Sequence, residues 1–470
     1  MLFLNTSAEL MYNKKKESIE LHTKFLYKLL HNPTVLLAPV VIVIILLTPL
    51  AGNFNPVAIW NDRSYDVLSL LTLLGPFAGA VGAWEGAGTG RLRKRSGDSR
   101  PGWAGQVMTW TKTAVWGLLL YMLIWVVVFV ITATQATWGS PLLGPPLVGA
   151  IAMLALSALG FAMGDRWSSR FAAPVVGIGL LAAQSWFALA LARNPLGYLT
   201  PNFAAGLSVS VWYGVRSDLV IVQLTFLCGL LAITLASLAI GRSITSSKVY
   251  PAALAVCGII LVLASFAGVA SSSADIHGIR IPLLYNAATD RPIPYTPVCS
   301  QAALPVCVHP AYSAELPQLS AVINRLAAPL IGLPGAPVQA DQRPVDGPWQ
   351  VVGNVLVVPP FAAHASDWAD PNEPFMRMLF TEIALGLVSE PRPVTNSPGS
   401  EHHKSQRNYT TTQQAITLYL LQQANITADP DILQVSPKAR AFEQSLATQS
   451  RASQCAWLAQ HYMALLQGKL

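Results

Sequence analysis

Ionised side chains are scarce in this sequence. Only 11% of its 470 residues are Asp, Glu, Lys or Arg, whereas 53% are hydrophobic. That balance is unusual for a water-soluble chain of this length. The charges are also uneven: residues 1–270 carry 18 Lys/Arg and 9 Asp/Glu, whereas residues 271–470 carry 12 and 14. The composition therefore predicts an apolar, basic first part and a more polar second part.

Several catalytic motifs are also missing. There is no GxxxxGK[ST] phosphate loop, so the chain has no visible means of hydrolysing a nucleotide. HExxH and GxSxG are absent as well, which removes the single-helix zinc site and the nucleophile elbow. We therefore expect no catalytic residue, cofactor or metal on this chain. Were the second part an enzyme, His309, His364 and Asp367 would be the residues to test.

Long apolar runs are what the sequence has instead. Seven stretches approach the roughly 20 residues that cross a bilayer as a helix. The ionisable residues stand at the ends of these stretches, which argues against a proton-coupled transporter. The predicted spans are residues 34–51, 65–84, 113–134, 146–164, 171–192, 219–241 and 251–270.

The basic residues give these spans an orientation. With the N-terminus in the cytoplasm, the inside segments hold fifteen Lys/Arg and the outside connections hold three. Positive charge stays on the cytoplasmic side of a membrane. The first span then acts as an uncleaved signal-anchor, and the chain is a multi-pass protein of the cell membrane. Because the helix count is odd, residues 271–470 lie outside the cell. Basic charge confined to these segments also argues against nucleic-acid binding.

Residues 1–33 form the cytoplasmic N-terminus and contain an amphipathic segment at 17–31. Its apolar residues gather largely on one side and its lysines on the other, which predicts a helix lying in the membrane interface. A plain soluble helix is the alternative. The residues that define the two sides are Phe25, Leu26, Leu29, Lys24 and Lys28.

Two connections between spans are unusual. The inside connection 85–112 is long and basic, and we expect it to be a loop with at most a short helix around Leu92. The outside connection 193–218 is apolar for a loop. It is expected to fold back as short helices at the outer interface, with Tyr198, Trp212 and Tyr213 at headgroup level.

The second part, residues 271–470, predicts an extracellular α+β domain. A short helix is expected at 319–328 and a β-strand at 351–358. Three further helices are expected at 374–387, 411–424 and 439–466. The whole chain is then an α-helical membrane protein with seven transmembrane helices and a C-terminal extracellular domain.

The five cysteines divide between the two parts. Cys299 and Cys307 frame a short segment (CSQAALPVC), which a disulfide can close if this part is exported. Such a ring contributes about 2–3 kcal/mol in the chain-entropy model. Two free thiols are the alternative. Cys455 has no partner and is expected to be buried beside Trp457, and the two cysteines in apolar runs are expected to be inert.

The order of these features resembles a known family. An interfacial helix, a second span that ends at Trp84-Glu85-Gly86, a basic loop and an apolar outer connection resemble the permease subunits of ABC-type exporters of the six-helix class. The segment from Glu85 to Thr89 (EGAGT) partly matches the acidic-Gly-Thr pattern of that family, and 160–174 (GFAMGDRWSSRFAAP) is similar to bacterial members. The seventh span and the extracellular domain are departures from the family.

The resemblance implies a partner and a coupling site. Permeases of this class pair as homodimers or heterodimers, and the loop after the second helix docks on a separate ATPase that binds ATP and Mg. The residues that the resemblance assigns to this coupling loop are Glu85, Gly86, Arg91, Arg93, Lys94 and Arg95.

We therefore expect a permease subunit that exports an amphipathic or lipophilic cargo, such as a peptide or lipid-like molecule. Two alternatives remain. One is a membrane sensor or immunity-type protein whose extracellular domain binds a ligand or a protein partner. The other is a membrane-anchored extracellular hydrolase.

Overall fold

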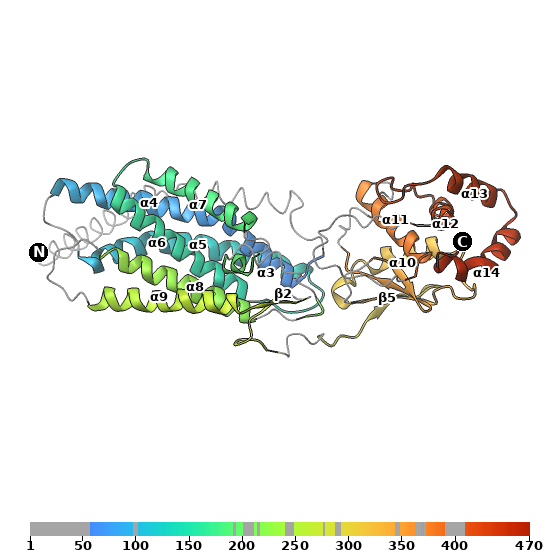
Figure 1. Cartoon of the computed structure of the whole chain (residues 1–470), viewed down its shortest axis with the longest axis horizontal. Helices are drawn as coiled ribbons and strands as arrows, with labels where there is room; N and C mark the ends of the chain where they lie inside the picture. The colour runs from blue at the N-terminus through green and yellow to red at the C-terminus, as the bar shows by residue number, and fades with distance from the viewer. Residues whose placement is uncertain are drawn as a thin grey trace, which may run out of the picture.

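The computed structural model describes residues 57–96, 102–190, 194–200, 211–213, 217–239, 249–275, 278–286, 293–343, 348–361, 368, 370, 373–390 and 409–470. The predicted interfacial helix and the predicted span 34–51 lie outside these residues. Within them the chain forms two parts along one long axis (Figure 1): a bundle of long helices from α3 to α9, and a smaller mixed domain at one end.

The bundle contains the apolar helices that the sequence predicts. Within the described residues, five segments are long and apolar enough to cross a membrane: Trp60–Leu92, Trp103–Gln135, Gly144–Trp167, Ser217–Ser237 and Val249–Ala270. They belong to α3 (Trp60–Ser69) with α4 (Leu71–Ser96), α5 (Trp103–Gln135), α6 (Gly144–Trp167), α8 (Ser217–Ser237) and α9 (Val249–Ala270). α7 (Ala172–Ala190) is also helical, with a shorter apolar stretch at Ala172–Phe187. Six of the seven predicted spans are thus helical, and the count of seven stays a prediction.

Burial differs sharply among these helices. In the most apolar stretch of Trp60–Leu92, and likewise in that of α6, 67% of the residues are buried. In the most apolar stretch of α9, only 17% of the residues are buried. Large apolar side chains on α5, α7 and α9 are exposed, among them Val130, Ile178 and Leu263. An exposed apolar surface of this extent fits lipid rather than water. The chain is therefore a membrane protein in which α4 and α6 form the centre of the bundle.

Glycines allow α4 and α6 to pack backbone to backbone. A Cβ built on Gly82 would overlap the carbonyl oxygen of Ser157, and one on Gly86 would overlap that of Phe161. From the other side, a Cβ on Gly160 would overlap the Gly79 carbonyl oxygen. Small residues at every fourth position are the usual means of close helix approach in a membrane.

The predicted loop 85–112 is largely helical instead. α4 continues to Ser96 and α5 begins at Trp103, so only residues 97–102 separate the two helices. Leu92 lies on the last turns of α4, with 66% of its surface exposed. The loop prediction was wrong because Gly86 and Gly90, although poor helix formers, pack closely against α6 and its C-terminal end.

The connection 193–218 agrees with its prediction in part. One short 3₁₀-helix, Pro195–Leu199, is present, and residues 201–210 lie outside the described part. Trp212 was expected at headgroup level but is only 1% exposed. It belongs to the core of the C-terminal domain, together with Val57, Ile59 and Val211 from the bundle. Tertiary contact, rather than the interface, therefore determines the position of this tryptophan.

The C-terminal domain is built on a five-stranded mixed sheet of order β3-β4-β5-β7-β6. Its strands are β3 (Val298–Cys299), β4 (Val306–Val308), β5 (Gln339–Gln342), β6 (Gln350–Val352) and β7 (Val355–Val358). A small hairpin, β1 (Ser273–Asp275) with β2 (Gly278–Arg280), follows α9. The α+β prediction for this part is confirmed.

The predicted strand 351–358 is a hairpin of two strands. Val352 pairs with Val355 in an antiparallel register, so Gly353 and Asn354 form the two-residue turn between β6 and β7. Gly353 has φ +61°, which suits glycine in a tight hairpin turn. The prediction missed this turn because the valines on both sides of it form one apolar run.

The helices of the domain follow the prediction with one exception. α10 (Leu316–Ala327), α11 (Pro374–Leu387) and α12 (Thr411–Gln423) lie close to their predicted ranges. The predicted helix 439–466 is two helices, α13 (Pro437–Ala447) and α14 (Arg451–Leu466). The Ser450 side chain accepts the backbone N–H of Ser453 and so caps the second helix, which explains the break.

Candidate functional site

The end of the bundle away from the domain carries most of its described basic residues, and we call it the basic end. Arg91 and Lys94 lie on the last turns of α4, and Lys112 lies near the start of α5. Arg166 ends α6 and Arg170 follows it. Arg93 and Arg95 also lie on α4, although their side chains fall outside the described part. All six predicted coupling residues are therefore on one helix end rather than in a loop.

Glu85 and Gly86 stand where α4 passes the end of α6. Gly86 is buried against the Phe161 backbone, whereas Glu85 is half-buried and Trp84 is 49% exposed. The Thr89 hydroxyl donates to the Gly86 carbonyl oxygen at 2.7 Å and contacts Oδ1 of Asp165 at 3.4 Å. These bonds join the EGAGT segment of α4 to α6.

Asp165, which is 4% exposed, was noted in the sequence only as a residue at a helix end. It precedes Ser168, whose hydroxyl donates to the Asp165 carbonyl oxygen at 3.1 Å and whose side chain packs on Gly90. The signal that would have found this contact is the matched four-residue spacing, Gly82-Gly86-Gly90 on α4 and Gly160-Gly164 on α6.

Further hydrogen bonds tie the other helices into the basic end. The Trp103 indole N–H donates to the Leu235 carbonyl oxygen at 2.9 Å, which joins α5 to α8. The Arg166 guanidinium donates to the Ser237 carbonyl oxygen at 3.3 Å, which joins α6 to α8. Trp110 and Phe161 are buried in the apolar cluster beneath these bonds. A force applied to one helix here is therefore carried to its neighbours.

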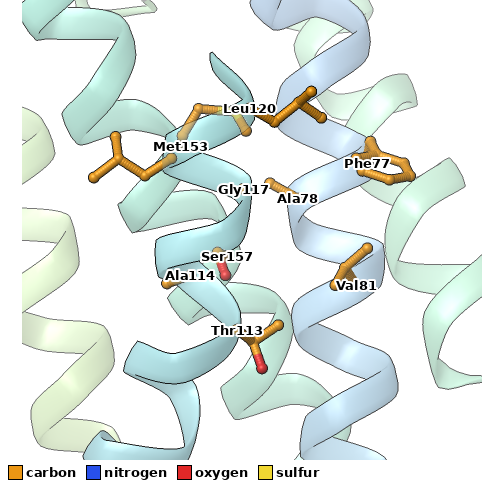
Figure 2. A pocket seen from close by; sticks show the side chains of 10 residues that line it. Phe77, Ala78, Val81, Thr113, Ala114, Gly117, Leu120, Met153 and Ser157 are labelled. Atoms are coloured by element: carbon orange, nitrogen blue, oxygen red, sulfur yellow. The ribbon is translucent and has the colours of Figure 1, made fainter. Parts of the chain in front are cut away.

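A small cavity lies deeper in the bundle, between α4, α5 and α6 (Figure 2). Its walls are Phe77, Ala78 and Val81 on one helix and mainly small residues on the others, including Gly117. The hydroxyls of Thr113 and Ser157 are its polar groups. With a volume of about 10 Å³ the cavity admits at most one water molecule, so it is no cargo site in this conformation.

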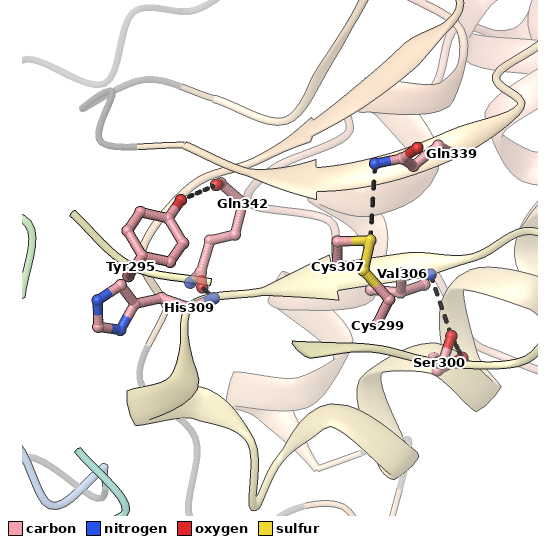
Figure 3. Close-up of a disulfide and its surroundings, with 9 residues drawn as sticks. Tyr295, Cys299, Ser300, Val306, Cys307, His309, Gln339 and Gln342 are labelled. Atoms are coloured by element: carbon pink, nitrogen blue, oxygen red, sulfur yellow. Dashed lines mark hydrogen bonds between the residues drawn. A yellow bond between two sulfur atoms is a disulfide. The ribbon is translucent and has the colours of Figure 1, made fainter. Parts of the chain in front are cut away.

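The cysteine pair of the C-terminal domain forms the predicted disulfide. Cys299 on β3 and Cys307 on β4 are opposite each other in the antiparallel register and are bonded (Figure 3). Such a bond indicates an extracellular portion, because disulfides persist outside the reducing cytosol. Cys455 was expected to be buried but is exposed, whereas its neighbour Gln454 on the first turn of α14 is buried.

Removing the disulfide tests its contribution to the domain. We expect the Cys299→Ser/Cys307→Ser double variant to lower the free energy of unfolding by about 2–3 kcal/mol, because the unfolded chain regains the entropy of an open loop. Thermal unfolding of the full-length protein measures this. Cys455→Ser is the matched control, and an equal loss in that variant would contradict the expectation.

Of the three residues that an enzyme function would make testable, one is described by the structure and two are not. His309 is buried, and its Nδ1 accepts the backbone N–H of Ala311 at 3.1 Å, so this side chain caps the short 3₁₀ turn Pro310–Tyr312. His364 and Asp367 lie outside the described residues. In the described part of the chain, no group of three or more His, Cys, Asp or Glu side chains is arranged to hold a metal ion.

Comparison with known proteins returned no matching family model, no matching curated protein and no matching solved structure.

Proposed function

We propose that the chain is the permease subunit of an ABC-type exporter, driven by a separate ATPase that binds ATP and Mg. The main support for this proposal is the basic end of α4. There a helix that begins in the membrane continues as a rigid, positively charged end for a partner to dock on.

The length of the helices supports this arrangement. α5 has 33 residues, which corresponds to about 50 Å at 1.5 Å per residue. The hydrocarbon core of a bilayer is about 30 Å thick. α4 and α5 are therefore expected to project from the membrane at the basic end as a helical hairpin. A projecting hairpin fixed to its neighbours is suited to transmit motion between a soluble partner and the membrane helices.

The mechanism follows from the packing. Because α4 and α6 touch backbone to backbone, they move as one body when the basic end is displaced. α5 is joined to this pair through side chains around the small cavity, so separation of α5 from α4 and α6 is the least costly way to open the bundle. The faces of α4, α5 and α6 that would part carry apolar side chains and two hydroxyls, those of Thr113 and Ser157, so a path opened between them would suit an amphipathic or lipophilic cargo. A second permease chain would supply the other wall of the cargo's path through the membrane.

Charge reversal at the basic end tests the partner. We expect the full-length protein, extracted in mild detergent, to copurify with an ATPase subunit. Arg91→Glu with Lys94→Glu should reduce that recovery about tenfold or more, since the loss of about 1.4 kcal/mol of attraction has this effect. The matched control reverses two exposed charges of the domain, Arg325→Glu with Lys438→Glu. Recovery of no ATPase with the wild-type chain would refute the permease function.

A membrane sensor is the second candidate function, and a buried apolar cluster shared by the bundle and the domain favours it. Residues of the bundle and the domain share one buried cluster, which would carry a change in the domain to the membrane helices. A sensor would retain the domain's ligand or partner but would copurify with no ATPase. The same experiment therefore separates the two functions.

A further inference from the structure

The junction between the domain and the bundle centres on one buried histidine. His309, at the end of β4, is 0% exposed. Its ring lies edge-on to Trp138, which is in the α5–α6 connection, with ring centroids 4.4 Å apart. Tyr295 is at 4.5 Å and Trp212, from the α7–α8 connection, at 5.6 Å. A single imidazole thus contacts both outer connections of the bundle.

Hydrogen bonds hold the histidine on the domain side. Its backbone N–H donates to Oε1 of Gln342 on β5 at 2.9 Å, and Tyr295 donates its hydroxyl to the Gln342 carbonyl oxygen at 3.3 Å (Figure 3). The next residue, Pro310, accepts the Thr137 hydroxyl of the α5–α6 connection at 2.7 Å. The ring and its neighbour therefore form both the packing and the polar contact across the junction.

The protonation state of the ring follows from its partners. Nδ1 accepts the Ala311 N–H, so it carries no proton, and the proton of the neutral ring is on Nε2. Nε2 has no hydrogen-bond partner. A second proton would have to enter at Nδ1, where it would face the Ala311 N–H, and the resulting charge would have no acceptor. This environment accepts only the neutral imidazole.

We propose that His309 is a proton-operated latch, whose neutral ring holds the domain on the outer connections of the bundle and whose protonation releases them. The step transfers one proton from solvent to Nδ1 and breaks the Ala311 cap. This frees the short 3₁₀ turn Pro310–Tyr312, on which Thr137 also bonds. The latch is independent of the cargo and of the ATPase.

The direction of the pH effect follows from burial. Burial lowers the pKa of His309 from 6.5 to about 4, so the released state binds a proton more readily than the docked state. Docking is therefore fully stable above pH 6.5 and weakens as pH falls towards 4. The full difference between the two pKa values corresponds to roughly 300-fold in the docking equilibrium and is reached only well below pH 4, whereas the change between pH 7 and pH 4 is roughly 100-fold.

Few other charges face this ring. Tyr295 and Tyr312 are the titratable groups packed beside it, and Asp62 of α3 acts on Tyr312. The pKa of Tyr312 is raised, first by burial and then by Asp62, so this phenol stays neutral in the same pH range. The residues from β5 and from the two connections that contact the junction are neutral. Two carboxyl groups lie near Tyr312: Asp62 and the buried Glu315, whose backbone N–H donates to the Tyr312 carbonyl oxygen. A variant that removes only the imidazole therefore separates the titration of His309 from theirs.

The release would reach far into the domain. Aromatic contacts continue from Trp212 through Tyr312, Phe361 and Trp368 to Phe380 on α11. Each pair is within 6.5 Å between ring centroids. Packed aromatic rings therefore connect the junction without a break to α11 of the domain.

Hydrogen exchange of the full-length protein in lipid nanodiscs tests the latch. We expect the protection of residues 309–313, corrected for the intrinsic pH dependence of exchange, to fall by tens to about 100-fold between pH 7 and pH 4. His309→Gln preserves an acceptor for the Ala311 N–H but has no titrating ring, and should remove the pH dependence. His461→Gln on α14 is the matched control and should retain it.

Two outcomes would overturn the proposal: constant protection in the wild-type protein over this range, or an equal fall in His309→Gln. If His309→Gln does not fold, Thr137→Val serves instead. It removes the second contact without touching a titratable group, so it should lower protection at every pH and leave the wild-type pH dependence unchanged. Loss of the pH dependence in that variant would contradict the assignment to His309.

Discussion

Replacing Gly86 with leucine is expected to prevent the membrane bundle from folding, whereas the same replacement at Gly88 leaves it folded. A Cβ on Gly86 would overlap the Phe161 carbonyl oxygen and approach the Asp165 nitrogen at 2.9 Å. Both are backbone atoms, which cannot move aside without separating α4 from α6. Overpacking of this kind costs more than about 3 kcal/mol.

Gly88 is the matched control, because it lies two residues away on the same helix and a Cβ there would meet nothing within 4 Å. The two variants therefore change helix propensity and side-chain volume in the same way. Size-exclusion chromatography in detergent and limited proteolysis measure the difference. Equal behaviour of the two variants would show that the close contact of α4 with α6 does not hold the bundle together.

Replacing Gln413 with methionine is expected to produce the largest loss of stability in the C-terminal domain. Gln413 is 2% exposed, and its amide donates to the carbonyl oxygens of Val388 at 3.1 Å and Leu465 at 3.0 Å. Its Oε1 accepts the backbone N–H of Thr410 and completes the capping box of α12. One side chain therefore joins α12 to the C-terminal ends of α11 and α14.

Methionine has a similar volume but makes none of these bonds, so buried backbone groups lose their partners. The expected loss is about 3 kcal/mol, or roughly 10 °C in the unfolding temperature. Gln422→Met is the control, since Gln422 lies on the same helix but is exposed. Thermal unfolding monitored by tryptophan fluorescence compares them, and a shift below about 2 °C for Gln413→Met would contradict the role of the network.

The helical part of the fold was predictable from local pattern. Apolar length alone located six helices, because a span must satisfy its own backbone hydrogen bonds. Their ends were less predictable. α4 continues past Glu85 because its glycines pack on α6, and a single glycine does not reveal whether it packs or ends a helix, although the four-residue spacing of Gly82, Gly86 and Gly90 favours packing.

In the domain, the errors have local and non-local causes. The Gly353-Asn354 turn was present in the sequence as a hairpin signal and was overlooked within an apolar run. The exposure of Cys455 depends on which residues in the first turn of α14 other elements cover: Gln454 is buried there and Cys455 is not. The disulfide was predictable because its two cysteines are close in sequence.

For the candidate sites too, some features were predictable from the sequence and others were not. The residues of the basic end were predictable as a group, since charge and glycine spacing are visible along the chain. The buried position of Asp165 against Thr89 joins residues 76 positions apart, and hydropathy gives no information about that contact.

By itself, the sequence determined that the chain enters a membrane, where its helices run and that Cys299 can bond to Cys307. Those properties depend on apolar length, charge and short-range spacing. Only the tertiary structure decided that Trp138 and Trp212 enclose His309. The three residues come from separate segments of the chain, and their contact exists only because the bundle and the domain bury one continuous apolar core.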